Sequence, residues 1–274
     1  MRDDVQARLA LELELRAALA RGELRVHYQP VLLVGSGGLV GFEALVRWPH
    51  PGRGLVPPGA FIPLAEETGL ITELDRWVLR TACAQLKAWL ALAPGLAVSV
   101  NLSSRGFSRP DLAAFVAEVL AGTGVPPAQL RLELTESLLA DATPAVRDTL
   151  AALRRLGVGL HIDDFGTGYS SLAYLQRFDA DALKIDRSFV AKMLEHEDSA
   201  ELVRTIVGMA HNLGMEVVAE GVETPAQRDA LSALGCRYAQ GFLFSKPLPA
   251  AAAEGLLRGE KAAANARQPE FVDA

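Results

Sequence analysis

The chain has 274 residues, of which 50% are hydrophobic, and this suits one large domain with a sizeable buried core. Its formal net charge is −6 and no basic run stands out, which disfavours binding to duplex DNA or RNA. No segment has the apolar length of a membrane span, and the N-terminus lacks the apolar core of a signal peptide. The two cysteines, Cys83 and Cys236, are far apart, so we expect buried thiols in a reducing cytoplasm.

In chain order, the first expected element is a charged, amphipathic helix at residues 1–22. A hairpin-like pair of strands follows at 24–34 and 39–48, and strands then alternate with helices. The later strands are predicted at 96–103, 130–137, 158–165, 182–186, 215–223 and 238–244. The helices are predicted at 71–92, 111–121, 144–156, 170–177, 199–213 and 225–234. Thr143-Pro144 and Thr224-Pro225 each combine an N-cap with a proline at the first helical position.

Two opening strands and six further strand–helix units make eight strands, the number that closes a (β/α) barrel. The short connection between the first two strands makes one strand antiparallel. We therefore predict an α/β fold, a modified TIM (β/α)8 barrel with one antiparallel strand, preceded by the N-terminal helix. An open doubly wound sheet is the alternative, although no predicted strand is followed by a G-x-G-x-x-G turn. The expected units are a linker helix at 1–22, the barrel at 23–250 and a C-terminal tail at 251–274, helical and then disordered.

Alternation along the strands indicates which side chains face the barrel interior. In residues 130–135 every second residue is leucine, which suits packing under helices, and Glu133 lies on the opposite face. The same analysis of the other strands gathers a polar set at the carboxyl-end mouth of the barrel. These residues are Glu43, Asn101, Glu133, Asp163, Lys184, Asp186, Glu220 and Gln240. His161 shares the inward face but lies two residues deeper, and we interpret it as a core residue.

Acidic side chains outnumber basic ones in this polar set. A purely structural network of ion pairs does not account for the excess, because unpaired buried carboxylates are costly and divalent cations are the usual remedy. The ligands are nearly all oxygen atoms, which favours Mg²⁺ or Mn²⁺ over zinc. The adjacent Asp163 and Asp164 can reach two ions, and a two-metal site suits in-line attack on a phosphodiester.

Nine short motifs carry a resemblance to a known family. They are "YQP" (28–30), "EALVRW" (43–48), "VNLS" (100–103), "LELTES" (132–137), "DDFGTGYSSL" (163–172), "LKID" (183–186), "AEGVET" (219–224), "QGF" (240–242) and "KPL" (246–248). In their order and spacing they resemble the EAL domains, which are bacterial cyclic di-GMP phosphodiesterases, over nearly the whole chain. The family fold is a modified TIM barrel with one antiparallel strand, which agrees with the pattern of elements.

The resemblance implies a role for each matching position. Two ions, Mg²⁺ or Mn²⁺, would bind, the first to Glu43, Asn101, Glu133 and Asp163, and the second to Asp163, Asp164 and Glu220. A water between them, hydrogen-bonded to Lys184, would be the nucleophile, with Glu220 nearby and Asp186 holding Lys184 in place. The implied substrate contacts are Gln29, Leu45, Arg47 and Gln240. Glu136 would brace the loop after the two aspartates by accepting hydrogen bonds from residues 166–170.

The implied reaction opens one phosphodiester of cyclic di-GMP to give linear pGpG. A non-catalytic cyclic di-GMP receptor is the alternative, although every named position carries the expected residue type. A glycosidase with paired carboxylates is weaker, because Asn101, Lys184 and the Asp-Asp turn would stay unexplained. The resemblance also implies a cytoplasmic homodimer. The N-terminal helix resembles the linker that often follows an upstream GGDEF domain, so we expect an upstream GGDEF or sensory domain in a longer protein.

Overall fold

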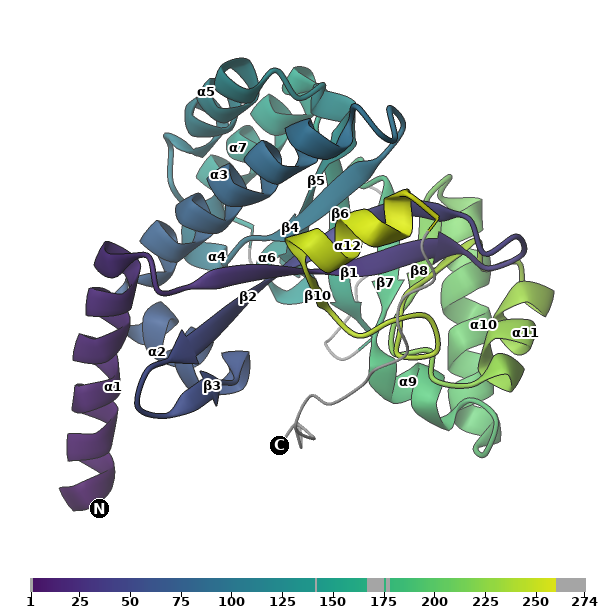
Figure 1. The fold of residues 1–274 in the computed structure, drawn as a ribbon. Helices are drawn as coiled ribbons and strands as arrows, with labels where there is room; N and C mark the ends of the chain where they lie inside the picture. Colours follow the sequence, from purple (N-terminus) through teal and green to yellow (C-terminus); the bar gives the residue numbers. More distant parts are fainter. Residues whose placement is uncertain (1, 141, 167–174, 176–177, 260–274) are drawn as a thin grey trace.

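The computed structural model of the chain describes residues 2–140, 142–166, 175 and 178–259 (Figure 1). Eight strands of this part of the chain form a closed barrel that helices surround. In chain order they are β1 (Arg25–Leu33), β2 (Leu39–His50), β4 (Ala97–Asn101), β5 (Leu130–Thr135), β6 (Gly159–Phe165), β7 (Ala182–Ile185), β8 (Glu216–Ala219) and β9 (Tyr238–Ala239). The predicted modified (β/α)8 barrel is confirmed.

Strand β1 is the antiparallel member of the barrel. It pairs with β2 from Arg25 to Leu32 and with β9 at Leu32 and Leu33, and these two pairings close the ring. Each other neighbouring pair of barrel strands in the described residues is parallel. Two short strands extend the sheet, because β3 (Gly54–Val56) pairs with the end of β2 and β10 (Leu248–Pro249) pairs with β1.

The helices differ in length and place. The longer ones are α1 (Arg2–Arg21), α2 (Pro58–Thr68), α3 (Ile71–Trp89), α5 (Leu112–Thr123), α7 (Pro144–Leu156), α10 (Glu197–Asn212), α11 (Pro225–Ala233) and α12 (Ala250–Leu257). Shorter ones lie in the connections: α4 (Ser104–Phe107), η1 (Pro127–Gln129), α6 (Glu136–Ala140) and α9 (Arg187–Lys192). Helix α1 projects from the barrel at the N-terminal end of the chain (Figure 1). None of the helices that the structure describes is long and apolar enough to cross a membrane.

The predicted helix starts have the expected caps. The Thr143 side chain accepts a hydrogen bond from the backbone N–H of Val146, and Pro144 opens α7. Thr224 and Gln227 form a reciprocal capping box at the start of α11. The α7 helix then ends at Gly157, whose φ of +84° is in the left-handed region that glycine adopts without strain.

Two of the differences from the prediction have a clear local cause. The strand expected at 238–244 ends after two residues, because Gly241 packs against the backbone of Val222 and the chain turns there. A Cβ on Gly241 would lie 2.1 Å from the Val222 carbonyl oxygen. Helix α2 was not expected, because Pro58 and Pro63 both lie within it and proline usually ends a helix. The helix predicted at 170–177 lies mostly outside the described residues.

The two faces of each strand separate the core from the site. On β5, Leu130, Leu132 and Leu134 are buried beneath the surrounding helices. The side chains on the other face of each strand point into the barrel, and those near the carboxyl ends of the strands are polar. All strands from β4 to β9 run the same way, so their polar ends meet at one mouth.

Candidate active site

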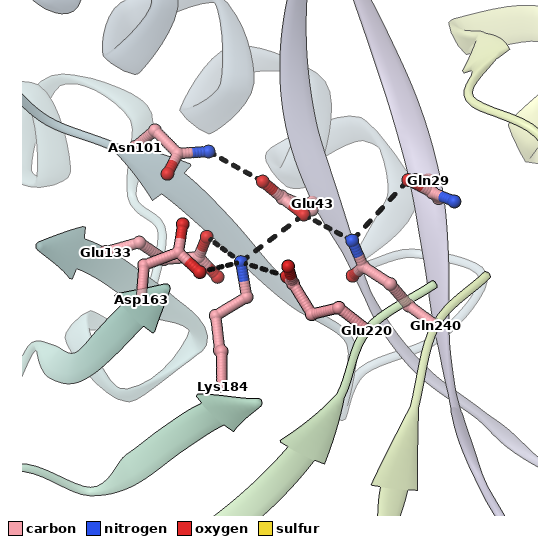
Figure 2. A network of polar contacts seen from close by, with 8 residues as sticks. All are labelled: Gln29, Glu43, Asn101, Glu133, Asp163, Lys184, Glu220 and Gln240. Carbon is pink, nitrogen blue, oxygen red and sulfur yellow. Dashed lines mark hydrogen bonds and ion pairs between the residues drawn. The ribbon is translucent and has the colours of Figure 1, made fainter. Parts of the chain in front are cut away.

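Lys184 is the centre of a cluster of acidic side chains inside the barrel mouth (Figure 2). Its Nζ lies 2.5 Å from Glu133 Oε2, 2.6 Å from Glu220 Oε1, 3.0 Å from Asp163 Oδ1 and 3.5 Å from Glu43 Oε2. The four carboxylates come from β2, β5, β6 and the residue after β8, and Lys184 comes from β7. The strand alternation in the sequence predicted this gathering.

Amide side chains hold Glu43 in place from two sides. Asn101 Nδ2 donates to Glu43 Oε1 at 2.6 Å, and Gln240 Nε2 donates to Glu43 Oε2 at 2.5 Å. Gln240 also donates to Gln29 Oε1 at 3.5 Å, and Gln29 Nε2 donates to the Ser245 carbonyl oxygen at 3.4 Å. Figure 2 shows Gln29 and Gln240 beside Glu43, on the side away from Asp163. One orientation of the Glu43 carboxylate is therefore selected.

Asp163 and Asp164 reach the same side of the sheet through a local distortion of β6. Regular alternation would send adjacent side chains to opposite faces. The register between β6 and β7 shifts between Ile162 and Phe165, and Asp164 has a φ of +53°, in the left-handed region. As a result, ligand oxygens of Asp163, Asp164 and Glu220 lie within 4.8 Å of one another, close enough to share a cation.

The cluster carries more negative than positive charge. Burial, together with the charges of Glu43 and Asp163, raises the pKa of Glu133 well above its usual range despite Lys184. Burial, with Asp163 and Glu43, also raises the pKa of Glu220 to about 8. Burial would lower the pKa of Lys184, but the surrounding carboxylates outweigh it and raise that pKa well above its usual range. The Lys184 ammonium therefore stays charged, and several carboxylates share this one positive charge.

The excess of carboxylates over positive charge favours the binding of divalent cations at the site. Four carboxylates share one ammonium, and Asp164 adds a fifth acid whose pKa is raised by burial and by Asp163 and Asp186. The buried Oδ1 of Asp163 has an ion pair but no hydrogen-bond partner among the described residues. Oxygen donors in excess of positive charge are what Mg²⁺ and Mn²⁺ bind, so the residues fit such ions.

Glu136 and Asp186 contact backbone close to the cluster. Glu136 Oε2 accepts a hydrogen bond from the N–H of Gly166 at 3.1 Å, at the start of the loop that follows the two aspartates. The rest of the loop segment that Glu136 is predicted to brace, residues 167–170, lies outside the described residues. Asp186 caps helix α9 by accepting from the Ser188 N–H at 3.0 Å, and it is not among the carboxylates in contact with Lys184.

A cavity of about 280 Å³ opens beside the cluster. Leu45, Arg47 and Asn101 line it from the barrel, and Ile62 and Glu66 line it from α2. The Oε1 of Gln240 is buried and has no hydrogen-bond partner within the described residues, which leaves an acceptor available at the mouth. The predicted substrate-contact residues thus lie around the acidic cluster, Gln29 and Gln240 against Glu43 and the other two in the cavity wall.

Asp75 is a polar residue of this region that the sequence analysis missed. Its Oδ2 accepts hydrogen bonds from the Ser103 hydroxyl at 2.6 Å and from the Ser103 N–H at 3.1 Å, just after Asn101. Burial raises the pKa of Asp75 to about 7. The sequence does contain a signal for this residue. Asp75 lies on the apolar face of α3 between Ile71 and Val78, where an acidic side chain is unusual.

His161 lies below the cluster on the inward face of β6. It is 6% exposed and its strand partner in register on β5 is Glu133. Burial, with the charges of Arg131 and Lys184, lowers the pKa of His161 well below its usual range, so the imidazole is neutral. No ion pair joins it to the carboxylates in the described part of the chain, which fits the interpretation of a core residue.

Comparisons with known proteins agree on the family of similar sequences and structures. The EAL domain family matches residues 12–247. The bifunctional diguanylate cyclase/cyclic di-GMP phosphodiesterase MucR of Pseudomonas aeruginosa is 46% identical over 91% of this chain and 37% of its own length. The cyclic di-GMP phosphodiesterase NbdA of the same organism is 47% identical over 91% of this chain and 32% of its own. A solved structure described as the PaMucR phosphodiesterase in complex with c-di-GMP superposes with a TM-score of 0.84 at 45% identity. That match covers 89% of this chain and 98% of the solved chain.

Proposed function

Because this chain belongs to the EAL domain family, we propose that it hydrolyses one phosphodiester bond of cyclic di-GMP to give linear pGpG. The observation that carries the proposal is the gathering of Glu43, Glu133, Asp163 and Glu220 around Lys184, with Asp164 turned to the same side. MucR, which is similar over nearly the whole chain, is described as bound to c-di-GMP in its solved form.

Two ions, Mg²⁺ or Mn²⁺, fit the acidic cluster. Glu43, Asn101, Glu133 and Asp163 would hold one, and Asp163, Asp164 and Glu220 would hold the other. When bound, such ions make a water nucleophilic at neutral pH and offset the charge of the phosphodiester. The amide groups of Asn101 and Gln240 fix the Glu43 carboxylate, so that one ligand is oriented before any ion binds.

Lys184 has a separate task in this proposal. Its buried ammonium lies at the centre of the cluster, where it can orient the attacking water and stabilise negative charge on the phosphoryl oxygens. Glu220, whose Oε1 lies 2.6 Å from the Lys184 Nζ, would hold the second ion beside this ammonium. Asp186 would act on the site indirectly, through the start of helix α9.

The substrate would bind along the mouth and the adjoining cavity. Arg47 supplies a guanidinium whose planar fork matches phosphate oxygens. Leu45 offers an apolar wall in the same cavity, and Gln29 and Gln240 supply amide groups at the opposite side of Glu43. We propose that these four residues contact cyclic di-GMP.

The test is to incubate the protein with cyclic di-GMP and Mg²⁺ or Mn²⁺ and to separate the products by chromatography. We expect pGpG, and we expect suppressed turnover in Ca²⁺, which prefers a larger and looser coordination sphere. Binding of cyclic di-GMP without any pGpG would support a non-catalytic receptor instead. Full turnover in Ca²⁺ or in a chelator would contradict the metal site.

The chain spans about a third of the length of the curated relatives it matches. We propose that it works beside an upstream GGDEF or sensory domain, with residues 1–22 as a linker helix, 23–250 as the catalytic barrel and 251–274 as a tail. We further propose a homodimer, which light scattering tests, since a strict monomer at high concentration would contradict it. A cytoplasmic location agrees with the free, buried thiols of Cys83 and Cys236.

A further inference from the structure

A second cavity, of about 260 Å³, lies at the end of the barrel opposite the acidic cluster. Its lining includes the first residues of four strands, which are Gly159 of β6, Ala182 of β7, Glu216 of β8 and Tyr238 of β9. Four residues of the acidic cluster instead lie towards or just beyond the carboxyl ends of β5 to β8: Glu133, Asp163, Lys184 and Glu220. The two sites are therefore separate, one at each end of the same barrel.

Arg131 brings a half-buried positive charge into this second cavity. Gly159 makes room for its side chain, because a Cβ there would lie 3.2 Å from Arg131 Cγ. Within the part of the chain that the structure describes, no hydrogen bond or ion pair joins the guanidinium to another residue. The side chain is half-buried, and a bound ligand would supply acceptors to its guanidinium.

His161 lines the same cavity from the middle of the barrel. Its side chain is more than nine-tenths buried, and among the described residues it too has no hydrogen-bond partner. An imidazole carries at least one N–H donor in either protonation state, so Arg131 and His161 both offer hydrogen-bond donors to this space. The apolar side chains of Val158, Ala182 and Val218 complete that part of the wall.

The acidic residues of the lining each form a close ion pair with another arginine, and Asp181 acts on Arg131 only at longer range. Asp181 accepts from Arg154 Nη1 at 2.6 Å and from the Leu160 N–H at 2.8 Å. Glu216 accepts from Arg237 Nη1 at 2.7 Å. The charge that remains without a close partner in the cavity is thus positive, and the donors there lack acceptors.

We propose that the cavity at the amino end of the barrel binds a small oxyanion, with its carboxylate or phosphate group on Arg131 and His161. A short apolar part of the same ligand would rest against Ala182 and Val218. The planar fork of a guanidinium matches both kinds of oxyanion. The site is a binding site and not a second active site, because its lining offers neither an activated nucleophile nor a cluster of metal ligands. Arg131 lies two residues before Glu133 on β5, so the ligand would lie further from the barrel mouth than Glu133 does.

The full chain with Mg²⁺ is titrated first with inorganic phosphate and then, separately, with acetate, and two-dimensional NMR follows the backbone amides and the arginine Nε–H groups. We expect saturable shifts at Arg131, Gly159 and His161 with at least one of the anions. The anion that binds with the higher affinity shows whether the site prefers a phosphate or a carboxylate group. These signals separate the cavity from any phosphate that binds at the carboxyl-end mouth. Absence of a saturable shift at these residues with either anion would overturn the proposal.

Two kinds of variant test the assignment to Arg131. Arg131→Met keeps much of the side-chain volume without the charge, and it should weaken binding at least tenfold. Ala128 is exposed on the cavity rim, so Ala128→Glu tests the charge without disturbing the barrel. It should weaken binding several-fold, whereas the matched Ala128→Gln should bind as the unaltered protein does. Equal affinity in the Ala128→Glu and Ala128→Gln variants would refute the site even if Arg131→Met did not fold.

Discussion

The side chain of Glu136 holds the backbone of Gly166 through a 3.1 Å hydrogen bond between Oε2 and N–H. This bond joins the start of α6 to the first residue after β6, so it spans the gap between a strand end that carries Glu133 and one that carries Asp163 and Asp164. Gly166 has a φ of +99°, and a Cβ there would lie 2.9 Å from Phe189. The turn after the aspartates is therefore restricted on both sides.

Glu136→Ala should fold normally and still bind cyclic di-GMP, but lose most of its activity and need more Mg²⁺ or Mn²⁺. The reason is that a ligand loop without its anchor no longer holds Asp163 and Asp164 in one geometry. Activity measured against metal concentration checks this. Glu136→Gln keeps an acceptor oxygen and should retain more activity. If Glu136→Ala has unchanged turnover and metal dependence, the loop keeps its conformation without Glu136.

Glu43→Ala should abolish hydrolysis and leave a folded barrel, because a metal ligand is lost while excess negative charge is relieved. We expect a loss of about 4 kcal/mol or more in transition-state stabilisation, which is about a thousandfold in kcat/KM. Steady-state kinetics at saturating Mg²⁺ measures it, with Glu118→Ala on the exposed surface of α5 as the matched control. Near-normal turnover would refute the assignment.

Lys184→Met should destabilise the fold in the absence of divalent cations. Four carboxylates lie around this ammonium, and its removal leaves buried charges unpaired, which costs about 3–5 kcal/mol in comparable cases. Mg²⁺ should restore much of the loss by taking over the neutralisation. Urea unfolding with and without Mg²⁺ measures the effect, and the exposed Lys192→Met is the control. Equal stability of the two variants without Mg²⁺ would contradict this account of the cluster.

Asp75→Asn should remove a pH dependence of stability. Because burial raises the pKa of Asp75 to about 7, against about 4 in the unfolded chain, protonation of this group favours folding. Its contribution is fully present below about pH 4 and is lost as the pH rises through about 7. The free energy of unfolding of the unaltered protein should therefore fall relative to that of Asp75→Asn over this window, by about 1.4 kcal/mol per unit of pKa difference.

Urea unfolding at several pH values checks the Asp75 prediction. Asp148→Asn, at an exposed position of α7, makes the same substitution on the surface and is the matched control. The other buried acids are common to all three proteins, so they cancel in the comparison. Parallel profiles for the unaltered protein and Asp75→Asn would show that Asp75 titrates normally in the folded state.

Local alternation was enough to predict the inward set around Lys184, since every second residue of a strand faces the same side whatever the rest of the fold does. It did not predict the φ of +53° at Asp164, because that distortion depends on how β6 meets β7. Asp75 was missed for a similar reason. Its partner Ser103 is 28 residues away, and only the packing of α3 against the end of β4 brings them together.

The antiparallel strand β1 has a consequence for how the chain folds during synthesis. It can form its hairpin with β2 early, but its other edge pairs with Tyr238 and Ala239, more than two hundred residues later. A nascent chain that has emerged only as far as β8 therefore has an open seam in its barrel, and contacts between such distant segments form slowly. Gln29 and Gln240 meet across this seam, and Gln240 also holds Glu43. The full set of contacts around Glu43 thus forms only once the last barrel strand has been made and docked.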